Sequence, residues 1–237
     1  MRILAFESSA KAASVALLTD GLLTGEYFQN SGQTHSRTLM KMAKDLLDNC
    51  ELSPADVDLA AWANGPGSFT GVRIGAAAAK GFCWGLELPC VPVSTLEAMA
   101  WSASCCKGTL CCCMDARRSQ VYNAIFEVRD GKPVRLREDR AISIEALAED
   151  LRGFDAPIRL LGDGAALVYD TLNGSQTARE LSFELLPEHL RHQRASGVGL
   201  AAWEAAQAGL TQDPALILPN YLRLSQAERE RLEKRSE

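Results

Sequence analysis

Residues 57–86, VDLAAWANGPGSFTGVRIGAAAAKGFCWGL, decide the fold class of this chain. The first seven form an apolar run that predicts a buried strand. The next segment, Asn64–Gly71, contains three glycines and a proline, so its backbone is expected to bend sharply and to approach another segment closely. A helix of small residues then runs from Val72 to about Leu86. A buried strand that passes directly into a helix is typical of α/β proteins.

Upstream of this stretch the pattern predicts three antiparallel strands and a helix. Apolar runs at 3–6, 14–18 and 22–29 are the strands. The pair Asp20-Gly21 suits the positive φ angles of a tight hairpin turn. Ser36 is expected to cap a helix that continues to about Asn49, since apolar side chains recur on one of its faces.

Downstream, the same rhythm of strands and helices occurs a second time. A strand at 91–93 and a helix at 95–103 complete the first unit, and a hairpin opens the second. Two consecutive units of the same order indicate a duplicated α/β domain with a central cleft. The further elements expected are strands at 109–114, 121–128 and 158–161, and helices at 143–151, after Gly164 and from Ser196 to Gly209.

Polar turns at the carboxyl ends of the strands mark a candidate cleft, because ligands of such folds bind there. Glu7-Ser8-Ser9 either offers donors to a phosphate or forms an ordinary turn. Asp115 either positions a metal-bound water or accepts backbone N–H groups, and Gly162-Asp163-Gly164 either admits a nucleotide or leads into a helix. The candidate nucleotide cleft therefore comprises Ser8, Ser9, Asp115, Gly162, Asp163 and Gly164.

Composition excludes a disordered chain and a stand-alone nucleic-acid binder. The 237 residues are 47% apolar and 23% charged, which is ordinary for a globular protein. With a net charge of −5, the chain is acidic and does not attract the negatively charged phosphate backbone of a nucleic acid. A partner is therefore expected to supply any positive surface. Residues 1–114 carry 8 Lys/Arg and 10 Asp/Glu, against 17 and 20 in residues 115–237. The first half is therefore either more deeply buried or covered on one face.

Five of the eight cysteines lie between Cys105 and Cys113, without the Cys-x-x-Cys spacing of a metal or redox site. Cys111 and Cys112 are neighbours on a predicted strand and point to opposite faces, so we interpret the cluster as small apolar residues of the core. The chain opens directly on a strand rather than on a basic and apolar leader. We therefore expect reduced thiols and a cytoplasmic location.

The histidines indicate no self-sufficient active site. His189 and His192 are three residues apart, but Glu184 and Glu188 do not complete the His-Glu-x-x-His pattern of a zinc protease. His35 precedes a helix in a polar loop, and neither a nucleophile elbow nor a Ser–His–Asp order is evident.

The helix at 72–86 contains two interior glycines, Gly75 and Gly81, each of which costs about 1 kcal/mol relative to alanine. Such small residues are typical of a helix against which another helix packs at short range. Arg73 and Lys80 interrupt a stretch that is already too short to span a membrane. The alternative is that this helix and the one at 36–49 only cover their own sheet.

Five motifs together resemble the TsaB (YeaZ) family of bacterial proteins of tRNA threonylcarbamoyladenosine (t6A) synthesis. The resemblance covers the whole chain and is weakest between about 130 and 195. It implies an actin-like, Hsp70-like ATPase fold (ASKHA) with two RNase H-like lobes, at 1–103 and 104–220. The alternating Arg and Glu residues of 221–237 predict a charged tail. The motifs are Ile3–Ser9, Ala63–Gly75, Met114–Arg118, Gly162–Gly164 and Pro219–Arg223.

The TsaB family is similar to the catalytic subunit TsaD, in which two histidines four apart on a helix bind an iron or zinc ion. The matching stretch here is Val93–Met99, so the ligand positions hold Thr95 and Met99. A hydroxyl and a thioether do not replace two imidazoles. The resemblance therefore implies a non-catalytic subunit without a metal.

The implied role is to bind TsaD and, with TsaE and TsaC, to support transfer of a threonylcarbamoyl group to N6 of the tRNA adenosine 3′ of the anticodon. tRNA would be contacted only through the complex, ATP or ADP would bind within it, and this chain would need no cofactor and no membrane. Family members pair with TsaD, or with themselves when alone, through a four-helix interface. The expected interface residues are Leu39, Met40, Leu46, Leu47, Arg73, Gly75, Ala78, Ala79, Trp84 and Gly85.

Two alternatives remain open at this point. One is an ATP-binding or ATP-hydrolysing enzyme that uses the cleft around Ser8, Ser9, Asp115 and Asp163. The other is a peptidase that acts on TsaD. A glutamate in place of Ala78 is expected to break the pairing with TsaD if the first interpretation is correct.

Overall fold

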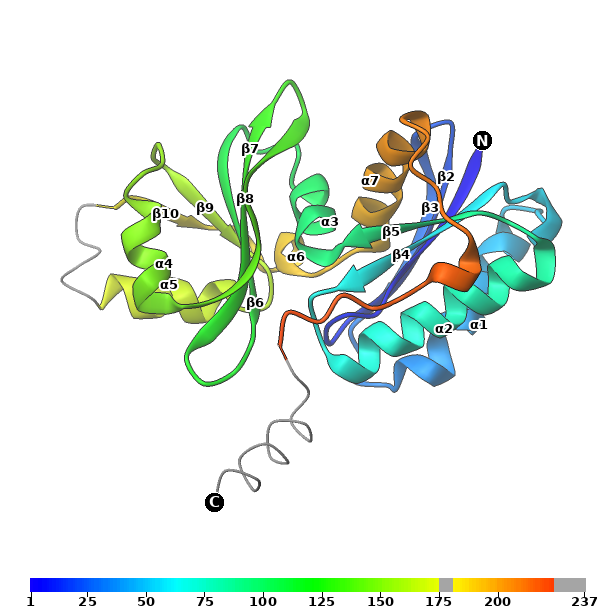
Figure 1. Cartoon of the computed structure of the whole chain (residues 1–237), viewed down its shortest axis with the longest axis horizontal. Coiled ribbons are helices and arrows are strands. Elements are labelled where there is room, and N and C mark those ends of the chain that lie inside the picture. Colours follow the sequence, from blue (N-terminus) through cyan, green and yellow to red (C-terminus); the bar gives the residue numbers. More distant parts are fainter. Residues whose placement is uncertain (175–180, 224–237) are drawn as a thin grey trace, which may run out of the picture.

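The computed structural model describes residues 1–174 and 181–223, which form two lobes side by side (Figure 1). The first lobe alternates strands and helices in the order expected from the sequence. Its elements are β1 (Arg2–Glu7), β2 (Ala13–Thr19), β3 (Leu22–Gln29), α1 (His35–Asn49), η1 (Pro54–Asp56), β4 (Leu59–Gly65), α2 (Phe69–Leu86), β5 (Cys90–Ser94) and α3 (Thr95–Ser102).

The second lobe starts with a three-stranded meander and then also alternates strands and helices. The short strand β10 and helix α6 carry no clear signal in the sequence. The elements of this half of the chain are β6 (Gly108–Asp115), β7 (Gln120–Arg129), β8 (Lys132–Ser143), α4 (Ile144–Leu151), β9 (Ile158–Leu161), α5 (Ala165–Asn173), β10 (Phe183–Leu185), α6 (Glu188–Arg191), α7 (Ala195–Gln207) and η3 (Pro214–Leu216).

The two sheets have the same topology, which confirms the duplication. The strand orders are β3-β2-β1-β4-β5 and, reversed in the sheet, β8-β7-β6-β9-β10. In each lobe the first three strands are antiparallel and the later pairings are parallel. This is the RNase H-like arrangement, and two such lobes around a cleft make the actin-like fold.

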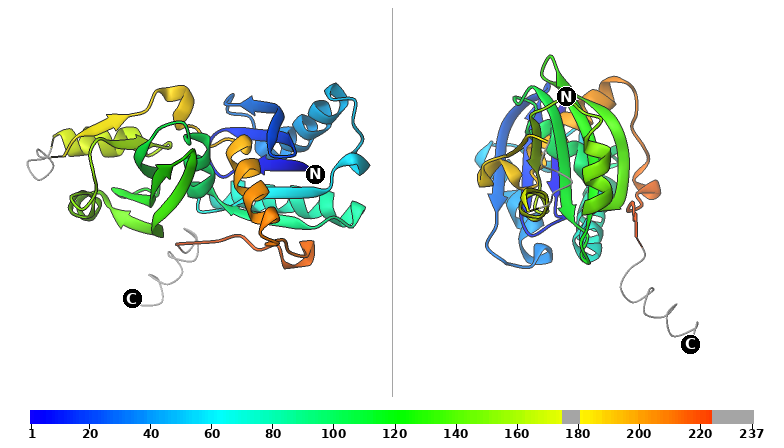
Figure 2. Two further views of the ribbon diagram at one scale, coloured as in Figure 1. Left: turned by 90° about the horizontal axis from the view of Figure 1, so that it is seen from above. Right: turned by 90° about the vertical axis from the view of Figure 1, so that its left-hand side faces the viewer.

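Each unit ends in a helix that covers the sheet of the other unit. Leu96, Met99 and Ala100 of α3 pack on the second sheet. Val198 and Ala202 of α7 pack on the first, against the face that carries Ile3 and Ala5. The opposite face of the first sheet, with Leu4 and Phe6, is covered by α1 and α2. Figure 2 shows α7 lying on the first lobe.

This exchange changes the expected division of the chain at residues 103 and 104. That boundary separates the two sheets, but α7 belongs to the first lobe although its residues lie in the range 104–220. The physical reason is that β1 is apolar on both faces and needs a cover on each. Of the expected tail at 221–237, residues 224–237 lie outside the described residues.

Several element boundaries differ from the expectations by a few residues. Helix α1 begins at His35 after Thr34 rather than after Ser36, and neither side chain caps it. Helix α2 begins at Phe69, because the Ser68 hydroxyl accepts a hydrogen bond from the Gly71 amide. Helix α7 begins at Ala195 instead of following Ser196. The Asp20-Gly21 turn has the expected positive φ angles, 49° and 79°.

The cysteines of β6 are core residues, as expected. Cys111 and Cys113 face one hydrophobic cluster and Cys112 faces the other. Burial raises the pKa of the Cys112 thiol well above its ordinary value, so this thiol stays protonated and unreactive. Among the described helices, none combines the length and the apolar character that crossing a membrane requires.

Candidate functional site

Helix α2 exposes a stripe of small residues on the side away from its own sheet. Ala77, Gly81 and Gly85 follow one another at four-residue intervals and are all exposed. A Cβ atom added at Gly81 or Gly85 would meet nothing within 4 Å. The exposed Trp84, with 65% of its surface accessible, borders the stripe. The backbone of α2 is therefore open to close approach by a second helix.

Half of the residues expected at the interface face inward instead. Gly75 approaches the turn after β1 closely, since a Cβ there would lie 2.7 Å from the Ser8 hydroxyl oxygen. The remaining expected residues with accessible surface are Met40, Arg73, Ala78, Trp84 and Gly85. Those buried in the core of the first lobe are Leu39, Leu46, Leu47, Gly75 and Ala79.

Sequence reasoning missed Ala77 and Gly81 as surface positions. The signal that could have found them is the phase of the helix. Val72, Ala79 and Cys83 form its buried side, and residues roughly half a turn away must then face solvent. The uninterrupted run of alanines conceals this phase, because alanine is accepted on either side.

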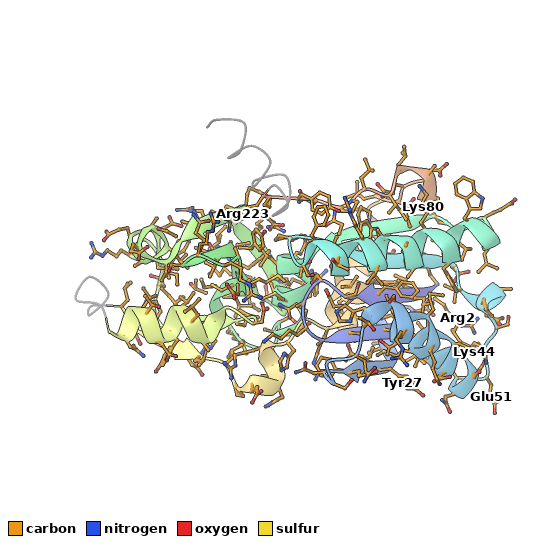
Figure 3. All side chains as sticks on the ribbon, turned by 90° about the horizontal axis from the view of Figure 1, so that it is seen from below. Arg2, Tyr27, Lys44, Glu51, Lys80 and Arg223 are labelled. Atoms are coloured by element: carbon orange, nitrogen blue, oxygen red, sulfur yellow. The ribbon has the colours of Figure 1, made fainter. Side chains whose placement is uncertain are left out.

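Helix α1 lies beside α2 on the same face of the sheet (Figure 3). Its exposed surface carries Met40, which is 46% accessible. Two ion pairs of the i,i+4 type, Lys41–Asp45 and Lys44–Asp48, also lie on that surface. The face formed by α1 and α2, which we call the helical face, therefore has apolar and small residues on α2 and charged residues on α1.

The loop between β4 and α2 packs directly on the turn that follows β1. The Ser68 amide donates to the Ser9 carbonyl oxygen at 2.6 Å, and the Ser8 hydroxyl donates to the Gly71 carbonyl oxygen at 2.9 Å. A Cβ added at Gly67 would lie 2.4 Å from the Ser9 carbonyl oxygen. The glycines of this loop are thus required by the close approach predicted from the sequence.

A cleft of about 510 Å³ lies between the lobes. It contains three of the six residues expected there, Ser9, Asp115 and Asp163. Gly162 and Gly164 lie behind them, packed against the backbone of β6 at Cys113 and Asp115. The other main lining groups are Lys11, Phe69, Arg117, Tyr122, Tyr221 and Arg223.

The carboxyl group of Glu7 occupies the hydrogen-bonding position at the Ser9 amide that a phosphate would use. The Ser9 amide, a donor of the turn, donates to Glu7 Oε1 at 2.5 Å. Glu7 is fully buried and its Oε2 has no hydrogen-bond partner. Burial raises the pKa of Glu7 to about 7, while the hydrogen bonds from Ser9 lower it and the nearby Asp163 raises it. The turn after β1 thus already binds a carboxyl group of its own chain.

The second lobe contributes two aspartates with different surroundings. Asp163 Oδ1 accepts a hydrogen bond from the Gln193 side-chain amide at 3.1 Å. Burial raises the pKa of Asp163, and the neighbouring Asp115 adds to this effect. Asp115 accepts the Arg117 amide at 2.7 Å, which matches the expectation that it binds backbone N–H groups. Within residues 1–174 and 181–223, no three His, Cys, Asp or Glu side chains come together to hold a metal ion.

Comparison with known proteins connects these features to one family. The model of the family described as "TsaD: tRNA N6-adenosine threonylcarbamoyltransferase" matches residues 29–231. The tRNA threonylcarbamoyladenosine biosynthesis protein TsaB of Bacillus subtilis is 30% identical over 96% of both chains. The chain belongs to the TsaB family. TsaB of Escherichia coli is 40% identical over about half of each chain.

A solved structure supports the same assignment for this TsaB-family chain. YeaZ from Pseudomonas aeruginosa superposes with a TM-score of 0.78 at 27% identity, over 93% of this chain and 99% of that one. The topology described above is therefore that of a YeaZ structure.

The TsaB-family chain holds Thr95 and Met99 inside the molecule, at the start and middle of α3. Both side chains are buried, and the Thr95 hydroxyl has no hydrogen-bond partner. The Met99 sulfur accepts a weak hydrogen bond from the Gln193 amide at 3.7 Å. A hydroxyl and a thioether in an apolar cluster do not fit an iron or zinc ion.

Proposed function

We propose that this chain is a non-catalytic subunit that binds TsaD and supports threonylcarbamoyl transfer to N6 of the tRNA adenosine 3′ of the anticodon. The observation that supports the proposal most directly is the open stripe of Ala77, Gly81 and Gly85 on α2. Relatives in the family are named for tRNA threonylcarbamoyladenosine biosynthesis. The matching family model describes the transferase itself.

The charge of the chain agrees with an indirect role toward tRNA. A net charge of −5 does not attract a phosphate backbone, so TsaD is proposed to contact the tRNA. TsaE and TsaC complete the proposed machinery, with ATP or ADP bound within the complex rather than required by this chain. In the absence of TsaD the same helical face would pair two copies of the chain. A role on tRNA supports a cytoplasmic location for this subunit.

Substitution of Ala77 by glutamate tests the proposed interface. Ala77 is exposed, so a glutamate there should cost little folding free energy in the isolated chain. Between two closely packed helices, its carboxylate would lose its water without gaining an opposite charge. We expect Ala77→Glu to lose co-purification with TsaD and to elute as a monomer in size-exclusion chromatography. Ala78→Glu is the less specific variant, because Ala78 also packs against the core of the first lobe.

Ala141→Glu is the matched control, since Ala141 is exposed on β8 in the other lobe. It should retain TsaD binding at the wild-type level. The interface assignment is wrong if Ala77→Glu and Ala141→Glu bind TsaD equally well.

The cleft supports a second candidate function, nucleotide binding. Lys11, Arg117 and Arg223 line it and would favour an anionic ligand. Against this, the Ser8 hydroxyl and the Ser9 amide already have partners in the chain. Calorimetric titration of the isolated chain with Mg-ATP distinguishes the two functions, because micromolar binding with turnover would favour an ATPase.

The peptidase alternative has less support. A nucleophilic mechanism needs a serine or cysteine hydrogen-bonded to a base. Among the described residues, no histidine side chain is hydrogen-bonded to a serine or cysteine; His35 contacts the Ala10 carbonyl oxygen instead. Cleavage of TsaD by the pure chain would reverse this preference.

A further inference from the structure

The segment Pro219–Arg223, one of the family motifs, runs across the mouth of the interlobe cleft. The chain passes from α7 through η3 along α2, where Lys80 Nζ donates to the Ala215 carbonyl oxygen at 3.3 Å. It then reaches the second lobe at Arg223, as Figures 1 and 3 show. Asn220, Tyr221, Leu222 and Arg223 all line the cleft.

The backbone of this segment is fixed to the loop between β4 and α2. The Asn220 amide donates to the Asn64 carbonyl oxygen at 2.7 Å. A Cβ at Gly65 would lie 2.4 Å from the Asn220 carbonyl oxygen, and Gly65 has a φ angle of +114°. Glycine at position 65 is therefore required for the segment to lie where it does.

Tyr221 fixes the segment to α2 through its side chain. Its ring stacks on Phe69 with a centroid distance of 4.7 Å and an interplanar angle of 28°. The Arg73 guanidinium lies 3.8 Å from the centroid of Phe69, and its Nε donates to the Tyr221 hydroxyl at 2.8 Å. Stacking, a cation–π contact and a hydrogen bond thus link Tyr221 to Phe69 and Arg73 of α2.

Arg223 extends from this anchor to the second lobe. Its Nη1 donates to the Ala116 carbonyl oxygen in the turn between β6 and β7. At the other side of the molecule, α3 joins the lobes through its packing and through polar contacts to β8. The Ser94 hydroxyl donates to Asp139 Oδ2, and Arg135 Nη2 lies 3.1 Å from Glu97 Oε2.

We propose that residues 219–223 are a latch that holds the interlobe cleft closed. The segment is attached to the first lobe through Tyr221, which contacts Phe69 and Arg73. It is attached to the second lobe through Arg223. Release of Arg223 frees the second lobe to move about the joint between α3 and β8. The latch is a property of the isolated chain and goes beyond the proposed role with TsaD.

Hydrogen–deuterium exchange of the full chain tests the latch. In Arg223→Ala we expect amides at 64–69 and at 115–120 to exchange faster together, by about tenfold, as for the loss of one charge-assisted hydrogen bond. Tyr221→Phe keeps the stack but loses the hydroxyl that Arg73 binds, so it should give a smaller increase at the same sites. Far-ultraviolet circular dichroism checks that both variants are folded.

Arg118→Ala is the matched control, because it removes the same kind of charge from the turn that Arg223 contacts. Arg118 is exposed, and among the described residues no side-chain hydrogen bond or ion pair involves it. Its exchange should equal that of the wild type. The latch is refuted if Arg223→Ala exchanges like Arg118→Ala, or if faster exchange is confined to residues 219–223. Because TsaD is absent from this experiment, its failure would leave the proposed function untouched.

Discussion

Glu7 ends β1 with its carboxyl group fully buried and one oxygen without a hydrogen-bond partner. The protonated form is favoured there, since the charged form is costly to bury and faces Asp163. Folding therefore takes up a proton near neutral pH. This single residue links the stability of the cleft to pH.

The expected consequence is a loss of stability as pH rises. The pKa of Glu7 rises from 4.5 to about 7 on folding. Its contribution to the free energy of unfolding is therefore complete below pH 4.5 and is lost as pH rises through 7. Between pH 5 and pH 8 we expect the free energy of unfolding of the wild type to fall by about 2–3 kcal/mol more than that of Glu7→Gln. Urea unfolding at the two pH values measures the difference.

Glu138→Gln, at an exposed position on β8, provides the comparison. It should keep the pH dependence of the wild type. A wild-type curve that parallels Glu7→Gln would show that Glu7 stays ionised in the folded chain.

At the scale of elements, helix α7 depends on a glutamate from a different strand. Glu26 on β3 accepts the Ser196 amide through Oε1 at 3.0 Å and Arg194 Nη1 through Oε2 at 3.0 Å. The Ser14 hydroxyl also donates to Oε1 and accepts the Ala195 amide. The helix N-terminus therefore has its cap in the first sheet rather than in its own sequence.

Glu26→Ala should accordingly destabilise the whole chain. It leaves Arg194 and the Ser196 amide without their acceptor in a largely buried place, at a cost of about 1–3 kcal/mol. Thermal or urea unfolding measures the loss. Glu127→Ala, which breaks the more exposed pair with Arg129, should cost less than about 1 kcal/mol. Equal losses would contradict the capping role.

The long-range cap explains why the sequence predicted some features and not others. The Asp20-Gly21 turn is local, and the glycines of the loop after β4 are visible in its own sequence, so residue types suffice to predict the turn and the close approach. The start of α7 was expected after Ser196, because its real cap is Glu26, which is distant in sequence. For Glu7-Ser8-Ser9 the sequence leaves a phosphate site and an ordinary turn both open, and in the structure the Ser9 amide donates to Glu7.

At the scale of the whole molecule, the exchange of α3 and α7 makes neither half complete alone. A fragment of residues 1–103 would expose the face of β1 and β4 that α7 covers, and α3 would lack the second sheet. We expect this fragment to bind the dye ANS and to aggregate. A fragment with residues 195–210 attached through a glycine–serine linker should bind less dye and show sharper thermal unfolding. Indistinguishable fragments would mean that α7 is dispensable for the first lobe.

The position of α7 also sets the order of events during synthesis on the ribosome. The ribosome makes the sheet of the first lobe early, but its cover arrives only when residues 195–207 leave the exit tunnel. At ordinary elongation rates this interval is on the order of 10 s. For that time the nascent chain presents an apolar sheet face, which makes it a natural client of ribosome-bound chaperones.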